Sequence, residues 1–188
     1  MIYVCGDSFG TSDPDSSIIP WHEQLDCTSL AQICVSNLMI SKQVDHAILH
    51  ASFIIVLFTT SCRYEHDSGP YTIHNLTTSN LNKVQQHIVT EHAKHFFDLD
   101  LEIYRNKCII ESVLQRLVDS GIPFLFDQGG FEHPKWGVDK TYFEKYNAYR
   151  SGYNLWDWGD SKLFRPYFHI TDQNKHNEIA NYYHAKTR

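Results

Sequence analysis

The chain begins Met1-Ile2-Tyr3-Val4-Cys5-Gly6-Asp7-Ser8-Phe9-Gly10, and this stretch decides how the rest of the sequence is interpreted. Residues 2–5 form a short run of β-branched and aromatic side chains, which predicts a buried β-strand. Gly6-Asp7-Ser8 ends the run and places a hydroxyl group at the carboxyl end of that strand. Ligands of open parallel α/β sheets bind at this edge of the sheet. Ser8 is therefore either a turn residue or a nucleophile.

Strand and helix patterns alternate after this opening. The apolar run 53–58 is continuous, which is typical of a central parallel strand buried on both faces. Further strands are predicted at 28–34, 122–126 and 154–156, and helices at 20–25, after Ser36, and at 81–95, 99–120 and 171–184. The expected core positions of the two best helices are Leu38, Ile40, Val44, Ala47 and Ile48, and then Leu101, Tyr104, Cys108, Val113, Leu114 and Leu117.

This alternation predicts an α/β fold, a three-layer α/β/α sandwich with a central parallel sheet of the flavodoxin-like kind. We expect one domain over residues 1–188. Within it, a long loop and helical insertion is expected at about 63–98, with a polar loop over 63–80. An irregular segment rich in aromatic residues is expected at about 127–153. Its aromatic side chains either line a carbohydrate or acyl groove or form a small satellite core.

The composition excludes several classes of protein. The net charge is −6 with no block of Lys and Arg, which argues against binding nucleic acid. No stretch of about 18 apolar residues predicts a membrane span, and no secretory signal pattern begins the sequence. The five cysteines form no CxxC pair, so free thiols in a reducing compartment are expected. A soluble protein, cytoplasmic or virion-associated, fits these features.

Four polar segments are predicted to share the carboxyl edge of the sheet: 6–8, 34–37, 59–63 and 127–130. A serine needs a base to become a nucleophile. Of the 12 histidines, His169 is the best candidate, because it precedes the last predicted helix in a loop returning to this edge. The alternatives are a turn or helix-cap role for Ser8 and a partly buried surface position for His169.

These segments together resemble the SGNH, or GDSL-type, hydrolase family. Gly6-Asp7-Ser8 after an N-terminal strand is similar to the first block of the family. His169-Ile170-Thr171, followed by His176 and Ile179-Ala180, is similar to its last block. Cys34-Val35-Ser36-Asn37 and Phe58-Thr59-Thr60-Ser61 lie where its second and third blocks are expected. The resemblance spans the chain through short motifs, and it looks most like the SGNH-type proteins of bacteriophages.

The resemblance implies hydrolysis of a small acyl ester, with O-acetylated glycans among the substrates. Ser8 would attack the carbonyl group and His169 would act as general base and then general acid. Asp7 is grouped with them as a candidate catalytic residue. The family's oxyanion hole corresponds to Ser8, Cys34, Asn37 and Thr60. The reaction needs no cofactor and no metal ion, and no nucleic acid or membrane partner is implied.

The sequence also departs from the family. Cys34 stands at the usual glycine of the second block, and Thr60 at the usual asparagine of the third. Pro166 occupies the place of the acid three residues before the histidine. Asp157, Asp160 and Asp172 are the remaining candidates to orient His169. These departures motivate an alternative to the leading hydrolase interpretation, namely a catalytically weak or inactive binding or virion-associated protein with the same fold.

Other polar residues have two interpretations each. Arg63 is either a binding group for an anionic part of the substrate or a surface ion-pair partner. Asp127 either orients a group of the site or begins a turn. The histidine pairs 46/50 and 92/95 have helical spacing, but no further ligand completes a metal site, so solvated helix faces are favoured. A nucleotide-binding flavodoxin-like protein is disfavoured because no glycine-rich phosphate loop is present.

Overall fold

A parallel β-sheet forms the centre of the molecule. The computed structural model describes residues 1–11, 18–33, 35–61, 63–64, 71–72, 82–127, 143–151, 170 and 172–188. Within these residues the sheet has four strands in the order β2-β1-β3-β6, and every neighbouring pair is parallel. The strands are β1 (Ile2–Gly6), β2 (Cys27–Ser29), β3 (Phe53–Leu57) and β6 (Phe124–Asp127). The predicted α/β class and parallel sheet are confirmed.

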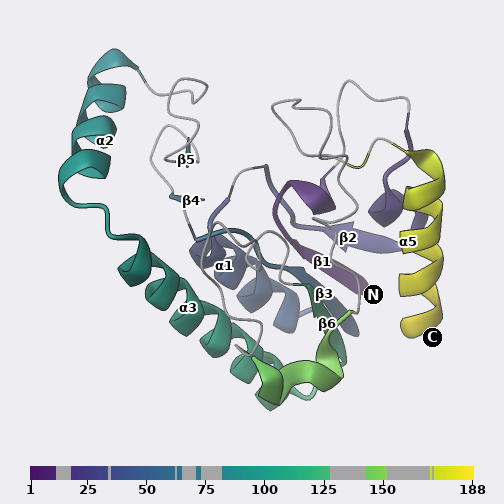
Figure 1. Cartoon of the computed structure of the whole chain (residues 1–188). Coiled ribbons are helices and arrows are strands. Elements are labelled where there is room, and N and C mark those ends of the chain that lie inside the picture. Colours follow the sequence, from purple (N-terminus) through teal and green to yellow (C-terminus); the bar gives the residue numbers. More distant parts are fainter. Residues whose placement is uncertain are drawn as a thin grey trace.

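Helices cover both faces of this sheet (Figure 1). Alternate residues of β3 point to opposite faces, because the side-chain period of a strand is two. Ile54 and Val56 pack against α1 (Asn37–Ile48) and α3 (Leu99–Ser120). Ile55 packs with Trp21 of the 3₁₀ turn η2 (Trp21–Gln24) and with α5 (Gln173–Lys186). The predicted burial of this strand on both faces is therefore confirmed.

Side-chain caps fix the helix ends that position the sheet edge. The Ser36 hydroxyl accepts hydrogen bonds from the N–H groups of Leu38 and Met39, as expected for the start of α1. Asp98 caps α3, and Gly121 ends it in the left-handed conformation that favours glycine, with φ of 69°. The helix α2 (Lys83–His95) begins with a complete capping box between Asn82 and Gln85.

Some predicted boundaries are wrong. β2 is confined to residues 27–29, because beyond it only isolated hydrogen bonds join the chain to β1: Leu30 N–H to the Val4 carbonyl and Gln32 N–H to the Gly6 carbonyl. The predicted loop 63–80 contains two short antiparallel strands, β4 (Arg63–Tyr64) and β5 (Tyr71–Thr72). The predicted strand 154–156 lies outside the described residues, and the predicted single domain stays a prediction.

The predicted core face of α3 is correct only in its second half. Val113, Leu114 and Leu117 are buried, but Leu101 and Tyr104 are 52% and 63% exposed and Cys108 is exposed. The buried stripe instead begins with Ile103, Asn106 and Ile110. Asn106 is polar, so hydropathy alone placed the stripe on the wrong face. Leu38 of α1 is also exposed, and with Leu101, Tyr104 and Cys108 it lines an open apolar groove between α1 and α3.

In the part of the chain that the structure describes, no helix is both long and apolar enough to span a lipid bilayer.

Candidate active site

Ser8 follows β1 at the carboxyl edge of the sheet, where the sequence predicts the site. Gly6 pairs with Leu57 of β3, and a Cβ atom at Gly6 would lie 2.6 Å from the Leu57 Cβ, so only glycine fits this close approach. Ser8 then begins the 3₁₀ turn η1 (Ser8–Gly10). Among the described residues, neither the hydroxyl nor the backbone N–H of half-buried Ser8 has a hydrogen-bond partner. Both groups are therefore available to a ligand.

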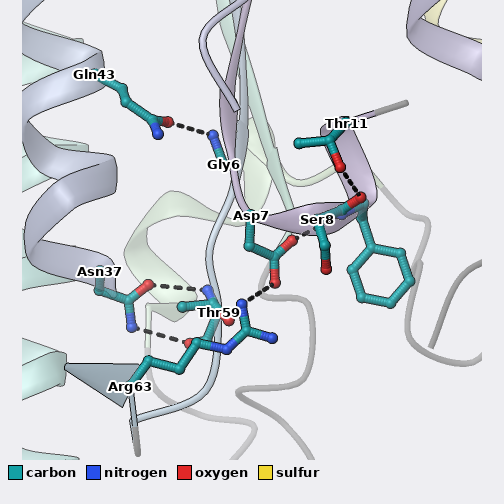
Figure 2. A network of polar contacts seen from close by, with 9 residues as sticks. Gly6, Asp7, Ser8, Thr11, Asn37, Gln43, Thr59 and Arg63 are labelled. Carbon is teal, nitrogen blue, oxygen red and sulfur yellow. Dashed lines mark hydrogen bonds and ion pairs between the residues drawn. The ribbon is translucent and has the colours of Figure 1, made fainter. Parts of the chain in front are cut away.

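Asp7 fixes the position of this turn. Its Oδ1 accepts a hydrogen bond of 3.1 Å from the Phe9 N–H and caps η1. Its Oδ2 lies 3.1 Å from Nη1 of Arg63, the first residue of β4 (Figure 2). The side chains of Asp7 and Arg63 are 2% and 12% exposed. Nη1 makes no aligned hydrogen bond, so the contact is a close ion pair rather than a directed N–H···O bond.

Asn37 joins the start of α1 to the residues that follow β3. Its Oδ1 accepts from the Thr59 N–H at 2.9 Å, and its Nδ2 donates to the Thr59 carbonyl at 2.9 Å (Figure 2). The same Nδ2 donates to Oδ1 of Asn106 at 2.8 Å. Asn37 is fully buried, and both amide hydrogens are used inside the protein. In this arrangement the Asn37 amide has no donor left for an oxyanion, so its predicted oxyanion role is not favoured.

Asn106 of α3 continues this network. Its Nδ2 donates to the Ser61 carbonyl at 3.2 Å and to the Glu102 carbonyl at 2.9 Å. The backbone is thus held on both sides of Thr60. Half-buried Thr60 itself has no hydrogen-bond partner among the described residues, and the neighbouring hydroxyls of Thr59 and Ser61 are buried without one. Of the residues that follow β3, Thr60 is therefore one whose side chain stays open to a ligand among the described residues.

Gln43 of α1 reaches the same edge from the helix layer. Its Oε1 accepts a hydrogen bond of 2.7 Å from the Gly6 N–H (Figure 2). Sequence reasoning missed both Gln43 and Asn106. The available signal was a polar side chain at helical spacing from apolar ones, because most polar side chains that become buried make at least one hydrogen bond.

The other face of the sheet links η1 to α5. The Trp21 indole N–H donates to the Phe9 carbonyl at 2.8 Å, and the Trp21 backbone N–H donates to Nδ1 of His176 at 3.1 Å. Nε2 of His176 lies 2.9 Å from the Ile170 carbonyl. Nδ1 accepts and Nε2 donates, so the ring is the neutral Nε2–H tautomer. Burial lowers the pKa of His176, although the Ile170 carbonyl and Asp172 act in the opposite direction.

The remaining predicted residues divide into two groups. His169, Cys34, Asp157 and Asp160 lie outside the described residues. Asp172 is exposed, and its carboxylate accepts from the Asn174 N–H as the cap of α5. Asp127 ends β6 and is buried, and its carbonyl accepts from the Phe58 N–H at 2.9 Å. Asp127 therefore belongs to the same sheet edge as Ser8, whereas Asp172 has a structural use as a cap.

Two further findings concern reactive side chains. Burial raises the pKa of the Cys5 thiol to about 12, so this cysteine beside the site is not a nucleophile at neutral pH. Within the described ranges, no three His, Cys, Asp or Glu side chains are grouped closely enough to hold a metal ion.

Comparison of the chain with models of protein families, with curated proteins and with solved structures found no match.

Proposed function

We propose that the protein is a serine hydrolase of the SGNH type, with a flavodoxin-like α/β/α fold, that cleaves small acyl esters. Ser8 is the nucleophile and His169 is its base. The site geometry supports the first assignment, because Ser8 stands at the ligand-binding edge of a parallel sheet with its hydroxyl and N–H groups free among the described residues. O-acetylated glycans belong to the proposed substrate class.

One observation carries the pairing of Ser8 with His169. Phe9, the residue after Ser8, and Ile170, the residue after His169, belong to the same buried cluster around Trp21. Trp21 donates to the Phe9 carbonyl, and His176 joins Trp21 to Ile170 through its two ring nitrogens. The two ends of the chain are thus fixed to each other by residues directly adjacent to the proposed nucleophile and base.

The proposed reaction has two acyl-transfer steps. The Ser8 Oγ attacks the ester carbonyl while His169 takes the hydroxyl proton, and the same histidine then protonates the departing alcohol. Water then attacks the carbonyl carbon of the acyl-serine while His169 takes a proton from the water. His169 returns this proton to the Ser8 oxygen as the carboxylic acid leaves. The negative charge that develops on the carbonyl oxygen is stabilised by the Ser8 N–H and by Thr60. Each such donor contributes roughly 3–4 kcal/mol to transition-state stability.

The test is covalent labelling with a fluorophosphonate, followed by mass spectrometry of the peptide that contains Ser8. We expect one adduct on Ser8 of the unmodified protein, no adduct in Ser8→Ala, and slow labelling in His169→Ala. Ser112→Ala, a change at an exposed serine of α3, is the matched control and should label normally. An adduct that persists in Ser8→Ala would contradict the assignment of the nucleophile.

A second function is favoured by one observation. Both amide hydrogens of Asn37 are used by Thr59 and Asn106, which removes one donor from the oxyanion hole. Together with Pro166 at the position of the acid, this supports a binding or virion-associated protein that keeps the fold without the activity. A folded protein that neither reacts with the fluorophosphonate nor hydrolyses p-nitrophenyl acetate would favour this alternative.

A further inference from the structure

Buried Asp7 and half-buried Arg63 form an ion pair at the turn that begins with Ser8. Asp7 uses both carboxylate oxygens, Oδ1 for the Phe9 N–H and Oδ2 for Arg63 at 3.1 Å. The carboxylate is 2% exposed, so it depends on these partners rather than on water. A buried charge without a partner is strongly unfavourable, and breaking a buried pair by removing one member is far more disruptive than replacing both.

The segment that precedes Arg63 is held from a different layer of the fold. Arg63 follows Ser61 by two residues, and the Ser61 carbonyl accepts a hydrogen bond from Asn106 of α3. Its guanidinium group then reaches Asp7 at the end of β1 (Figure 2). The ion pair therefore connects the segment after β3 with the turn that presents Ser8. Arg63 is thus connected to the turn of Ser8 through Asp7, whose other carboxylate oxygen caps that turn.

The pair also sets the charge at the site. Ester hydrolysis places negative charge on the carbonyl oxygen, and an unpaired carboxylate on the residue next to the nucleophile would oppose this charge. The guanidinium group of Arg63 compensates the carboxylate of Asp7, so together they contribute no net charge. Conversely, the positive charge of Arg63 is already compensated by Asp7, which weakens its attraction for an anionic group of a substrate.

We infer that Asp7 and Arg63 form a charge-compensated pair of positioning residues at Ser8, and that the acyl group accepted there is uncharged. This inference rests on the proposed hydrolase function. It replaces the expectation that Arg63 binds an anionic group of the substrate, because the guanidinium group of Arg63 is paired with the carboxylate of Asp7.

The test is a double-mutant cycle of Asp7→Asn, Arg63→Met and the combined variant. Asparagine keeps an oxygen that caps η1, and methionine keeps an apolar stem of similar reach. We expect Arg63→Met to lower the rate of Ser8 labelling by about 100-fold, the usual scale for disturbed stabilisation of an oxyanion. The combined variant should recover about 10-fold of this loss, because it no longer has an unpaired carboxylate. A purely structural loss of packing would not be reversed by Asp7→Asn.

A second measurement tests the charge of the acyl group. The kcat/KM values for p-nitrophenyl acetate and for the anionic p-nitrophenyl hemisuccinate are compared in the unmodified protein and in Asp7→Asn. The unmodified protein should prefer the acetate. Asp7→Asn frees the guanidinium group and should shift the ratio toward the hemisuccinate by about 10-fold, one charge-assisted hydrogen bond. Lys94→Met, which removes the exposed Lys94–Glu91 pair of α2, is the control and should leave both quantities unchanged.

The outcomes separate this inference from the proposed function. An unmodified protein that is never labelled at Ser8 overturns the function and the inference together. A labelled protein in which the combined variant is no faster than Arg63→Met overturns the positioning role of the Asp7–Arg63 pair alone. An unmodified protein that prefers the hemisuccinate overturns the preference for an uncharged acyl group, and a ratio that does not change in Asp7→Asn overturns the assignment of that preference to the Asp7–Arg63 pair. If Arg63→Met does not fold, Arg63→Lys serves instead, and its labelling rate should be lower than that of the unmodified protein because an ammonium group does not reproduce the guanidinium geometry. An unchanged rate in Arg63→Lys would then overturn the positioning role.

Discussion

The two faces of the sheet hold its carboxyl edge with different chemistry. On the face of α1 and α3, three amide side chains make the contacts: Gln43 binds Gly6, Asn37 binds Thr59, and Asn106 binds Ser61. On the face of η2 and α5, His176 joins Trp21 to Ile170, and His22 lies buried beside them. Amides do not titrate near neutral pH, whereas imidazoles do.

The two faces of the sheet are therefore expected to respond differently to pH. The amide face fixes the backbone on both sides of Thr60 and at the end of β1 in a way that is independent of pH. The histidine face fixes the residue after the proposed base, and it weakens when its rings gain protons. We therefore expect the nucleophile side of the site to depend on packing and hydrogen bonds, and the α5 side to depend on pH.

The largest effect is expected from Asn37→Ala on the amide face. The substitution leaves the Thr59 N–H and carbonyl and the Oδ1 of Asn106 buried without their partner. Unsatisfied buried polar groups cost about 1–3 kcal/mol each, so the free energy of unfolding should fall by about 3–5 kcal/mol. Urea denaturation followed by circular dichroism measures this loss.

Leu38→Ala is the matched control for this prediction. Leu38 is the next residue of α1 and is 53% exposed, so its truncation should change the free energy of unfolding by less than about 1 kcal/mol. Equal losses in the two variants would show that the amide network is not what holds this face, and the contrast between the faces would then be lost.

A smaller and pH-dependent effect is expected on the histidine face. Burial lowers the pKa of His22 and of His176 below the usual 6.5. The unfolded chain therefore binds more protons than the folded protein as the pH falls below 6.5, and stability that is present above this pH is lost. Each histidine contributes up to about 1.4 kcal/mol per pH unit within its window.

His176→Gln isolates one of these contributions. The variant should be less stable at pH 7.5, where the neutral ring makes both of its hydrogen bonds. It should then lose about 1 kcal/mol less than the unmodified protein between pH 7.5 and pH 5.5. Thermal unfolding at the two pH values measures the difference, and His184→Gln at an exposed position of α5 is the control. Parallel losses in all three proteins would remove the distinction between the two faces.

The sequence was most informative where local patterns and packing agree. The continuous apolar run over Phe53–Leu57 and the Ser36 cap predict β3 and α1 with nearly the observed bounds. The glycine at 121 ends α3 where its backbone conformation requires it. The convergence of Ser8, Thr60 and Asp127 at one edge follows from the parallel order of the strands, and this also could be predicted.

The polar contacts of the site could not be predicted in the same way. Asn106 interrupts an apolar stripe, so hydropathy assigned the first half of α3 to the opposite face, although Asn106 faces Asn37. Arg63, the partner of Asp7, lies 56 residues away in a segment with little regular pattern. Nothing in the local sequence around either residue predicts that the two form a pair. Such contacts depend on tertiary structure, because each one joins residues from different elements.

The smallest effect is expected at the exposed end of the amide face itself. Arg116 of α3 contacts Asp45 and donates to the Ser41 hydroxyl of α1, and its side chain and that of Asp45 are partly exposed. This link joins the same two helices as the buried contact between Asn37 and Asn106.

Water and salt screen exposed pairs, so Arg116→Ala should lower the free energy of unfolding by about 0.5–1 kcal/mol, and less in 0.5 M salt. Urea denaturation at two salt concentrations measures this, with Lys94→Ala as a control for an exposed pair within one helix. A loss as large as that of Asn37→Ala would mean that α1 and α3 are joined mainly by charge. The buried amides would then not be the main contribution of this face to the free energy of unfolding.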